Sequence, residues 1–521
     1  MKTRLQTAMK ALVLAAVTAA IYLPGLQYAP IYLANDEPKF ALQARAIAAT
    51  GRDLDGEFMP LYFSEAGYPA GRDPLIIYLT AVFLKRLPFS EATIRLPTAL
   101  VGVVDVVLMF VLARRIFERE ALAFAAAALL ALTPAHFIHS RLGVNVLYPL
   151  PFAMMWLLLL LAFLERESLR TLFAAAAVLG VGVYSYVAAT IMMPLYFVFT
   201  WLTLVRKKSA AVQYVVAVTG FAIPLLLLFA WHVRHPARYT ELVSAYRIYD
   251  ASRMNPLQGA KDLASYFSLG VRSGVYWDFF NPSFLFFSGD SSLINSTRRS
   301  GVFLWPVGLL LPLGVYRIVR FRPTWTNGLL LAGFVSAPLA AVLVAEVAIR
   351  RALLMVPFAV LIATGGLEWL FSAQQRLLRI AGVLLLALIA LQFRSFYLDY
   401  FTEYRDRSGV WFGGNIRAAL EDLIERDRER PASAVYVSNR IPFVEAYWSF
   451  YAVKHGREDL LLRTMYYDPS RFTAQVSAAD GLMVAPAHEE PTESLVRASG
   501  WRLLKVVTEP NGPASFMLYE K

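Results

Sequence analysis

Long apolar segments recur along this sequence and restrict what it can fold into. A helix needs about 20 apolar residues to cross the hydrocarbon core of a bilayer, and a segment in lipid must satisfy its own backbone hydrogen bonds, as a helix does. Hydrophobic residues make up 58% of the 521-residue chain and charged residues 17%, a balance typical of a polytopic membrane protein. We predict eleven spans, near residues 10–28, 92–113, 120–138, 146–164, 171–188, 189–205, 212–231, 301–319, 326–345, 351–370 and 378–396.

The positions of Lys and Arg predict the orientation of these spans, because cytoplasmic loops carry an excess of both. With the N-terminus inside and the C-terminus outside, one side holds Lys2, Arg4 and Lys10; Arg114, Arg115 and Arg119; Arg166 and Arg170; Arg206, Lys207 and Lys208; Arg317, Arg320 and Arg322; Arg376 and Arg379. The first segment also has the basic flank and apolar run of a signal peptide. We expect an uncleaved helix, because the apolar run continues to Leu26.

One further apolar stretch, "PLIIYLTAVFL" from Pro74, meets Lys85 and Arg86 too soon to make a span. We expect it to form a helix that lies in the membrane interface. Counting it as a span would move every later basic cluster to the opposite face of the membrane, against the trend for cytoplasmic loops.

Two features of the composition exclude classes of function. The formal net charge is +12, but the basic residues stand at the ends of apolar segments and form no aromatic-laced basic face. Nucleic acid is therefore not expected as a partner. The chain has no cysteine, which excludes a disulfide framework and a thiolate metal site.

The soluble parts are predicted on the outer side. The first outer loop covers residues 29–91; the second, 232–300, is rich in aromatic residues that suit either headgroup anchoring or contact with a lipid or sugar. Both loops belong to a predicted transmembrane domain of residues 1–398, and an α/β domain of residues 399–521 follows it. There, helices at "NIRAALEDLIERDRER" and "IPFVEAYWSFYAVKHG" alternate with strands at "ASAVYVSNR", "DLLLRTMYY", "DGLMVAPA", "WRLLKVVTE" and "ASFMLYEK".

The stretch "YLANDEPKF" places two adjacent carboxylates, Asp36 and Glu37, just beyond the first span. It opens an amphipathic helix from Glu37 to Thr50 with Gly51 as its stop; one face carries Phe40, Ala44, Ile47 and Ala48. Asn35 or Asp36 suits a helix cap, with Pro38 in the first turn. A carboxylate at the outer interface also suits a general base, and the two roles are compatible.

The order of features resembles the GT-C superfamily of membrane glycosyltransferases, within it the protein mannosyltransferase and aminoarabinose transferase group. The features are the acidic pair, a second acid before Pro in "YPAGRDPLIIYL", the many spans and the outer soluble domain. The resemblance implies a polyprenyl-phosphate sugar as donor, transferred at the outer face with inversion. Asp36 matches the catalytic aspartate, Glu37 would support the fold or orient Asp36, and Asp73 would position hydroxyl groups. A solvated loop acid is the simpler explanation of Asp73.

The leaving phosphate of such a donor needs cations. "EVAIRRALLMVP" places Arg350 and Arg351 at the outer start of a span, where enzymes of this resemblance carry a basic residue. Arg suits bidentate phosphate contact, whereas snorkelling to the interface is the alternative explanation. Arg141 and Arg298 are further phosphate-binding candidates among the outer arginines, which also include Arg234, Arg238, Arg272 and Arg299.

His136 and His139, three residues apart in "PAHFIHSRLGVNVLYPLP", have a spacing that permits shared metal ligation. No third ligand stands nearby, so they are weak candidates and a divalent metal is not favoured as a cofactor. Similar enzymes often carry an acid after the "SR" of this loop. Asn145 stands there instead, which weakens a metal-dependent mechanism.

The leading hypothesis is an inverting glycosyltransferase in the bacterial inner membrane. It would move one sugar from a polyprenyl phosphate to a lipid, glycan or protein hydroxyl, with the active site and the C-terminal domain on the outer side. A transporter or lipid flippase is the first alternative, for which Asp105 and Glu368 are the main intramembrane acids. An oligosaccharyltransferase with a polyprenyl diphosphate donor is the second. The C-terminal domain suits acceptor recognition or a capping role.

Overall fold

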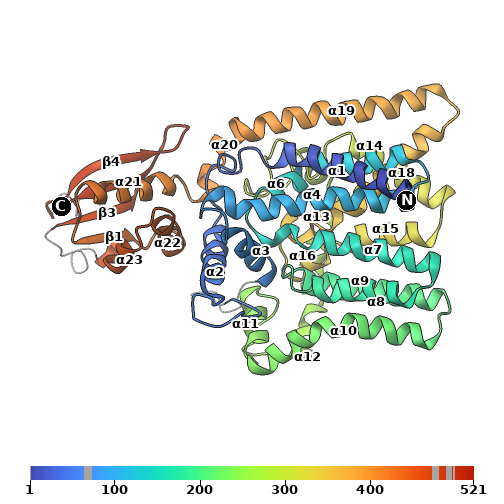
Figure 1. Ribbon diagram of the computed structural model, residues 1–521, viewed down its shortest axis with the longest axis horizontal. Helices are drawn as coiled ribbons and strands as arrows, with labels where there is room; N and C mark the ends of the chain where they lie inside the picture. The colour runs from blue at the N-terminus through green and yellow to red at the C-terminus, as the bar shows by residue number, and fades with distance from the viewer. Residues whose placement is uncertain (1, 64–72, 472–479, 489–495, 497–498) are drawn as a thin grey trace. The chain divides into compact units, whose positions relative to one another are not determined.

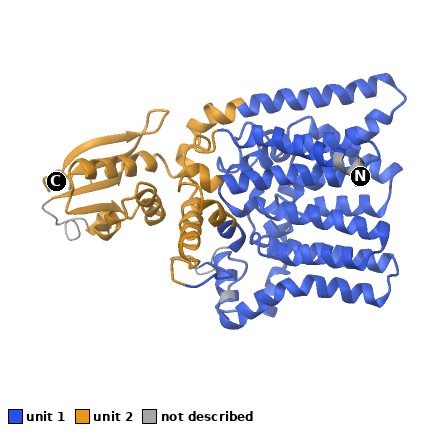
Figure 2. Cartoon of the chain, viewed as in Figure 1, with its two compact units in different colours: residues 1–24, 57–78, 96–397 blue, residues 25–56, 79–95, 398–521 orange. Residues whose placement is uncertain are grey.

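The computed structural model describes residues 2–63, 73–471, 480–488, 496 and 499–521. Its contacts divide the chain into two compact units. Unit 1 comprises residues 1–24, 57–78 and 96–397, and unit 2 comprises residues 25–56, 79–95 and 398–521 (Figure 2). Three helices contain a boundary between the two units: α3 (Pro74–Leu84), α4 (Glu91–Ile116) and α19 (Arg376–Phe401).

Unit 1 is built from helices (Figure 1). Besides its parts of the three shared helices, its elements are α1 (Lys2–Tyr22), α5 (Glu120–Ala131), α6 (Pro134–Ser140), η1 (Asn145–Leu147), α7 (Pro149–Arg166), α8 (Leu169–Gly182), α9 (Ala189–Arg206), α10 (Ala211–Arg234), α11 (Arg238–Ala245), α12 (Pro256–Leu263), α13 (Tyr266–Asp278), η2 (Ser283–Phe287), α14 (Val307–Phe321), α15 (Trp325–Ser336), α16 (Leu339–Leu343), α17 (Ile349–Ala352) and α18 (Met355–Ser372).

Within the described residues, 7 helices are long and apolar enough to cross a membrane, or 8 if α5 and α6, bent by 61°, make one span. The polytopic helical class is thereby confirmed. Each of the eleven segments predicted from the sequence contains a helix. However, α1, α8 and α14 are not among the helices that are long and apolar enough to cross a membrane, so the number eleven stays a prediction. The stretch from Pro74 forms α3, a helix of 11 residues, too short to span.

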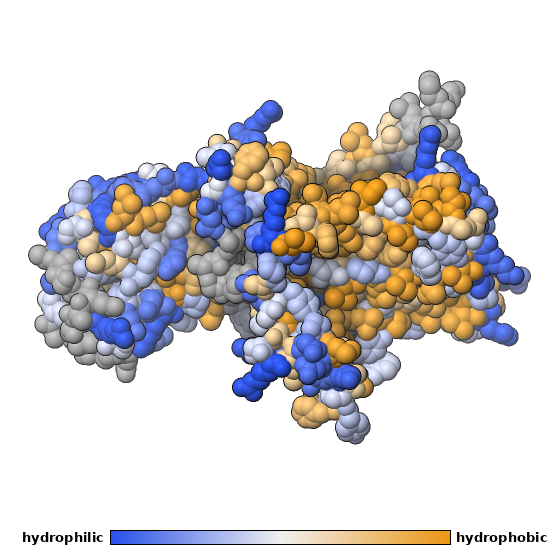
Figure 3. Space-filling view, turned by 90° about the horizontal axis from the view of Figure 1, so that it is seen from below, coloured by the Kyte–Doolittle hydropathy of each residue, from blue (hydrophilic) through white to orange (hydrophobic). Residues whose placement is uncertain are grey.

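Glycines bring α14 and α18 close together in unit 1. A Cβ atom at Gly314 would lie 1.9 Å from the Ile362 carbonyl oxygen, and one at Gly366 would lie 2.2 Å from that of Leu310. Small residues allow such close backbone approach between membrane helices. On the face seen in Figure 3, hydrophobic residues make up much of the surface of the helical part. On α10, Leu227 is 65% and Phe229 70% exposed, as expected of helices that face lipid.

Unit 2 contains a five-stranded sheet in the order β2-β1-β3-β5-β4. Strand β1 pairs in parallel with β2 and with the central strand β3, whereas β5 pairs antiparallel with β3 and β4. The strands are β1 (Ala434–Ser438), β2 (Thr464–Tyr467), β3 (Gly481–Pro486), β4 (Arg502–Thr508) and β5 (Ala514–Glu520). The helices of the unit are α2 (Asp36–Thr50), α20 (Glu403–Arg407), η3 (Gly409–Phe412), α21 (Ile416–Glu429), α22 (Val444–Lys454), α23 (Asp459–Leu462) and η4 (Pro469–Arg471).

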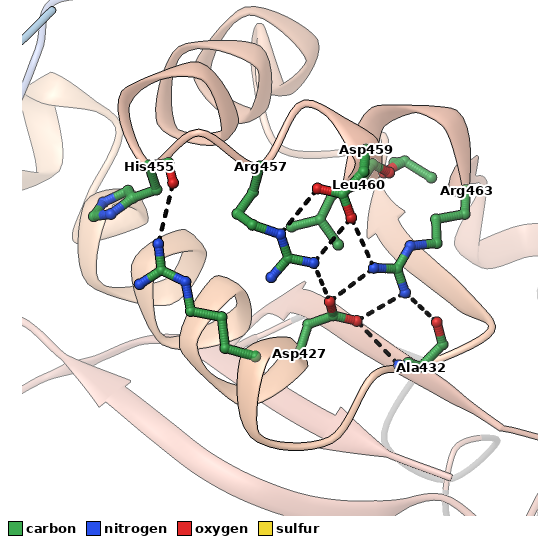
Figure 4. A network of polar contacts seen from close by, with 9 residues as sticks. Asp427, Ala432, His455, Arg457, Asp459, Leu460 and Arg463 are labelled. Carbon is green, nitrogen blue, oxygen red and sulfur yellow. Dashed lines mark hydrogen bonds and ion pairs between the residues drawn. The ribbon is translucent and has the colours of Figure 1, made fainter.

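The predicted C-terminal α/β fold is confirmed, with one correction. The prediction of a strand over the whole of "DLLLRTMYY" is wrong, because residues 459–462 form α23 and the strand begins only at Thr464. The Asp459 carboxylate bonds Arg457 and Arg463 (Figure 4). The pair of Asp459 and Arg463 has the i,i+4 spacing that neighbours on a helical turn have.

The first loop and the C-terminal residues of unit 2 share one hydrophobic core. Leu33, Ala41 of α2 and Ile94 of α4 pack in the same cluster as Leu420 of α21 and Trp448 of α22, all of them buried. Burial of such side chains stabilises the folded state by about 1.5–3 kcal/mol each. Residues 25–56 and 79–95 are thereby held to residues 398–521, so the loop that carries Asp36 has a rigid support.

Candidate functional site

The acidic pair opens α2, as the sequence predicts. Phe40, Ala44 and Ile47 of this helix are buried, and Gly51, at φ 72°, ends it by donating its backbone N–H to Ile47. The left-handed conformation of Gly51 explains why glycine suits this position.

Capping of α2 differs from the prediction. Asn35 is the N-cap residue, but its side chain makes no capping hydrogen bond. Instead, the Asn35 amide oxygen and the Leu33 carbonyl accept from the Tyr447 hydroxyl, at 3.0 and 2.8 Å. Glu37 reaches back and accepts the backbone N–H of Ala34 at 2.7 Å. The turn is therefore held by the second acid of the pair.

Glu37 is fully buried and forms an ion pair with Arg95. No role for Arg95 is predicted from the sequence. The Arg95 guanidinium donates to both carboxylate oxygens, at 2.7 Å from Nε and 2.9 Å from Nη2. Its other N–H groups reach the carbonyls of Leu26 (2.8 Å), Pro30 (3.0 Å) and Tyr32 (2.6 Å). The Arg95 guanidinium thereby holds together the segment from Leu26 to Glu37, which carries Asp36. A signal existed in the sequence: an arginine at the start of an apolar span needs a partner.

Asp36 differs from its neighbour in exposure. Its side chain is half-buried, whereas Glu37 has no exposed surface. Burial raises the pKa of Tyr447 well above its usual value, and the negative charges of Glu37 and Asp36 raise it further. Tyr447 thus stays a neutral hydrogen-bond donor beside the pair. Asp36 keeps access to solvent on a fixed backbone, which is what a base that accepts a proton from a bound hydroxyl requires.

Asp73 lies in unit 1, directly before α3, and accepts a hydrogen bond from Asn145. The side-chain amide of Asn145, in η1, donates to an Asp73 carboxylate oxygen at 2.7 Å. Asn145 is the residue at which the sequence departs from the acid of similar enzymes. An amide and a carboxylate bond each other directly, whereas two carboxylates at this distance would need a proton or a cation between them.

Arg350 and Arg351 lie on α17 and share one counter-ion. Both guanidinium groups pair with Glu346, Arg351 at 3.1 Å. Arg351 is also within 3.4 Å of the Tyr186 hydroxyl and stacks over the Tyr246 ring at 4.9 Å. Two arginines on one carboxylate leave a surplus positive charge, and aromatic contacts fix the orientation of Arg351.

The other two predicted phosphate-binding arginines have different surroundings. Arg141 is fully buried, donates to the Tyr22 carbonyl, and lies over the Phe137 ring. Arg298 is exposed, and its backbone has a φ of 57°. Burial against the first helix favours a structural role for Arg141.

The two histidines make different hydrogen bonds. Both ring nitrogens of His136 have hydrogen-bond partners, Nδ1 with the Tyr22 hydroxyl at 2.8 Å and Nε2 with Asp105 at 3.3 Å. His139 instead contacts the Ala135 carbonyl at 2.8 Å through its Nδ1. Among the residues that the structure describes, no three His, Asp or Glu side chains gather as metal ligands would.

The two intramembrane acids also have partners. Asp105 contacts His136, and Glu368 pairs with Arg317 of α14. In the sequence neither acid has an obvious partner, because these contacts join helices far apart along the chain. Paired acids that hold helices together are the simpler explanation of both residues.

Comparisons with known proteins agree with this architecture. Residues 69–231 match the sequence model of a family described as dolichyl-phosphate-mannose-protein mannosyltransferase. ArnT from Cupriavidus metallidurans in the apo state is similar in structure at 15% identity, with a TM-score of 0.58 over 98% of both chains. The same protein bound to undecaprenyl phosphate gives 14% identity and a TM-score of 0.58, over 98% of this chain and 97% of that one.

A second kind of structure is similar too. The oligosaccharyltransferase of Archaeoglobus fulgidus, in complex with Zn and sulfate, has 16% identity and a TM-score of 0.52, over 97% of this chain and 72% of that one. No curated protein matches the sequence. The chain therefore shares the fold of ArnT and of this oligosaccharyltransferase.

Proposed function

We propose that the protein is an inverting glycosyltransferase that moves a single sugar from a polyprenyl phosphate to a hydroxyl group of a lipid, glycan or protein. The observation that carries the proposal is the Asp36 carboxylate. It is partly exposed at the start of α2, while the buried Glu37–Arg95 pair beside it fixes the backbone. The match to the mannosyltransferase family and the ArnT-like fold support this donor class.

In the proposed reaction, the acceptor oxygen attacks the anomeric carbon as the bond from that carbon to the phosphate oxygen breaks. The hydroxyl proton passes to the Asp36 carboxylate, and attack from the face opposite the leaving group inverts the anomeric carbon. The leaving polyprenyl phosphate gains a negative charge. Arg351 and Arg350 would stabilise that charge, since charge-assisted bonds from Arg to phosphate are strong.

Asp73 has a positioning role in this proposal. Held by Asn145, its carboxylate is an acceptor for sugar or substrate hydroxyls. The proposed mechanism rests on Asp36 and the arginines. A transporter is disfavoured by the partners of Asp105 and Glu368.

We further propose an inner-membrane location in a bacterium, with the reaction and the C-terminal domain on the outer side. The support is the side shared by the basic clusters. In an accessibility scan of cells with cysteines placed singly at Lys207 and Lys208, a reagent that cannot cross the membrane should label neither position. Labelling of both from outside would overturn the orientation.

The experiment that tests the function follows a labelled sugar from native polyprenyl phosphates in membranes with the intact protein or with Asp36→Asn. Lipid, glycan and protein fractions are counted separately. Label should reach one fraction only with intact Asp36. The matched control is Asp55→Asn, an exposed acid of the same loop, which should transfer normally. Full transfer by Asp36→Asn would overturn the assignment of Asp36 as the base. If no fraction carries label that depends on Asp36, a transporter would be favoured.

A further inference from the structure

A partly open pocket lies among the ends of four helices of unit 1, away from the outer loops. Its volume is about 290 Å³. Arg115 and Glu165 stand in the last turns of α4 and α7, Arg317 stands near the end of α14, and Arg322 follows that helix directly. Thr326 and Asn327 of the first turn of α15 complete its polar side. Figure 1 shows the loops from α7 to α8 and from α14 to α15 at the same end of the unit.

The pocket carries an excess of positive charge. Arg317 pairs with Glu368, and Arg115 lies 3.3 Å from Glu165. Among the described residues, the Arg322 side chain has no ion-pair or hydrogen-bond partner, and the buried Nη1 of Arg115 has only its ion pair with Glu165. With two of the three guanidinium groups paired to carboxylates, the positive charge of Arg322 is left uncompensated, and an anion in the pocket would balance it. The start of α15 adds a favourable dipole for that anion.

The rest of the pocket wall is apolar. Ile116 of α4 and Leu161 and Leu164 of α7 line it beside the arginines. A free phosphate ion would leave these side chains uncovered, whereas a lipid headgroup would place its phosphate on the arginines and the start of its chains on the leucines. The location agrees with a lipid, because these helix ends carry the basic clusters expected at the cytoplasmic face.

We propose that this pocket binds the phosphate headgroup of an anionic phospholipid from the inner leaflet. The site is distinct from the proposed catalytic residues, which belong to the opposite ends of the spans in the predicted topology. Bound lipid would join α4, α14 and α15 through its phosphate group and contact α7 through the start of its chains. Its role would be to hold these helix ends together.

The test measures lipid retention by native mass spectrometry of the full-length protein in a neutral detergent. Phosphatidylglycerol should bind more tightly than phosphatidylcholine. Arg322→Gln should weaken phosphatidylglycerol binding at least about tenfold, the effect of losing a hydrogen bond between the guanidinium and the phosphate. Arg320→Gln is the matched control, because Arg320 is an exposed residue of the same helix end that does not line the pocket, and it should leave binding unchanged.

Three results would overturn the proposal. The first is equal retention of the two lipids by the intact protein. The second is equal phosphatidylglycerol binding by Arg322→Gln and Arg320→Gln. The third is displacement of phosphatidylglycerol by inorganic phosphate at equal concentration, which would identify a site for the free ion. Since Arg322 is exposed, Arg322→Gln without added lipid should unfold at the same temperature as the intact protein. This measurement serves as the control that the variant is folded.

Discussion

The Glu37 carboxylate and the Arg95 guanidinium meet in two hydrogen bonds of 2.7 and 2.9 Å with essentially no exposure to solvent. Fifty-eight positions separate them along the chain, and between them they hold the turn from Leu26 to Asp36. The adjacent carboxylates of the acidic pair therefore differ in role: Glu37 is a structural ion-pair partner, and Asp36 remains accessible.

Breaking this pair by Glu37→Gln should destabilise the protein by about 3–5 kcal/mol, because the guanidinium stays buried without its counter-charge. Thermal unfolding in detergent measures the loss. Arg45→Gln is the control, since the pair of Arg45 with Glu458 is largely exposed and such pairs contribute little. An equal, small effect of both substitutions would contradict a supporting role for Glu37.

Asn145→Asp should impair transfer and create a response to divalent metal. The new carboxylate would face Asp73 across the 2.7 Å contact now made by the amide, and like charges so close disfavour joint ionisation. We expect transfer to fall at least about tenfold through misplacement of Asp73, with partial recovery when Mg²⁺ or Mn²⁺ is added. Transfer rates with and without chelator measure the response.

Asn145→Ala separates charge from support in the same assay. It removes the hydrogen bond to Asp73 without adding a second carboxylate, so its transfer should fall without any recovery by metal. Metal recovery in Asn145→Ala, or undisturbed transfer in Asn145→Asp, would mean that the contact with Asp73 plays no part.

Arg351→Gln should raise the KM for the donor about 10- to 100-fold, the value of a lost hydrogen bond to a charged group. Arg351→Lys should recover only part of the affinity, because an ammonium group cannot make the bidentate contact. Steady-state kinetics over a range of donor concentration gives both values. Arg253→Gln is the control, as Arg253 is 84% exposed and pairs with Asp250. A donor KM unchanged in Arg351→Gln would remove this residue from the phosphate site.

Asp427→Asn should destabilise the protein by about 3 kcal/mol at neutral pH. The buried Asp427 carboxylate bonds Arg457 at 2.6 Å, Arg463 at 2.8 and 2.9 Å, and the backbone of Ala432 at 3.0 Å (Figure 4). Burial acts to raise the pKa of Asp427, but the hydrogen bonds from Arg463, Ala432 and Arg457 outweigh it and hold that pKa below its usual value.

The effect of Asp427 should depend on pH with a definite sign. A carboxylate whose pKa is lower in the folded state contributes its stability above the unfolded value of about 4 and loses it as the pH falls further. Free energies of unfolding of the intact protein and Asp427→Asn should therefore converge below about pH 4. Glu425→Gln, at an exposed pair with Arg428, should show no such convergence. A constant difference down to pH 3 would contradict the assignment.

The site was only partly predictable. The start of α2 at the acidic pair, its buried face and its end at Gly51 follow from local patterns of residues, which neighbours along the chain decide. Arg95, Tyr447 and the contact of Asn145 with Asp73 escape such reasoning, because each joins positions far apart in the sequence. The same holds for Asp105 and Glu368, whose partners lie on other helices.

The membrane class, the helical segments and the α/β character of the C-terminal residues follow from the order of residues alone, because hydrophobicity and its period are local properties. The shared core of residues 25–56 and 79–95 with residues 398–521, by contrast, becomes visible only in the folded chain. Burial of apolar surface is non-directional, so an exposed apolar face on α2 does not specify its partner. Complementary packing in the folded chain selects that partner.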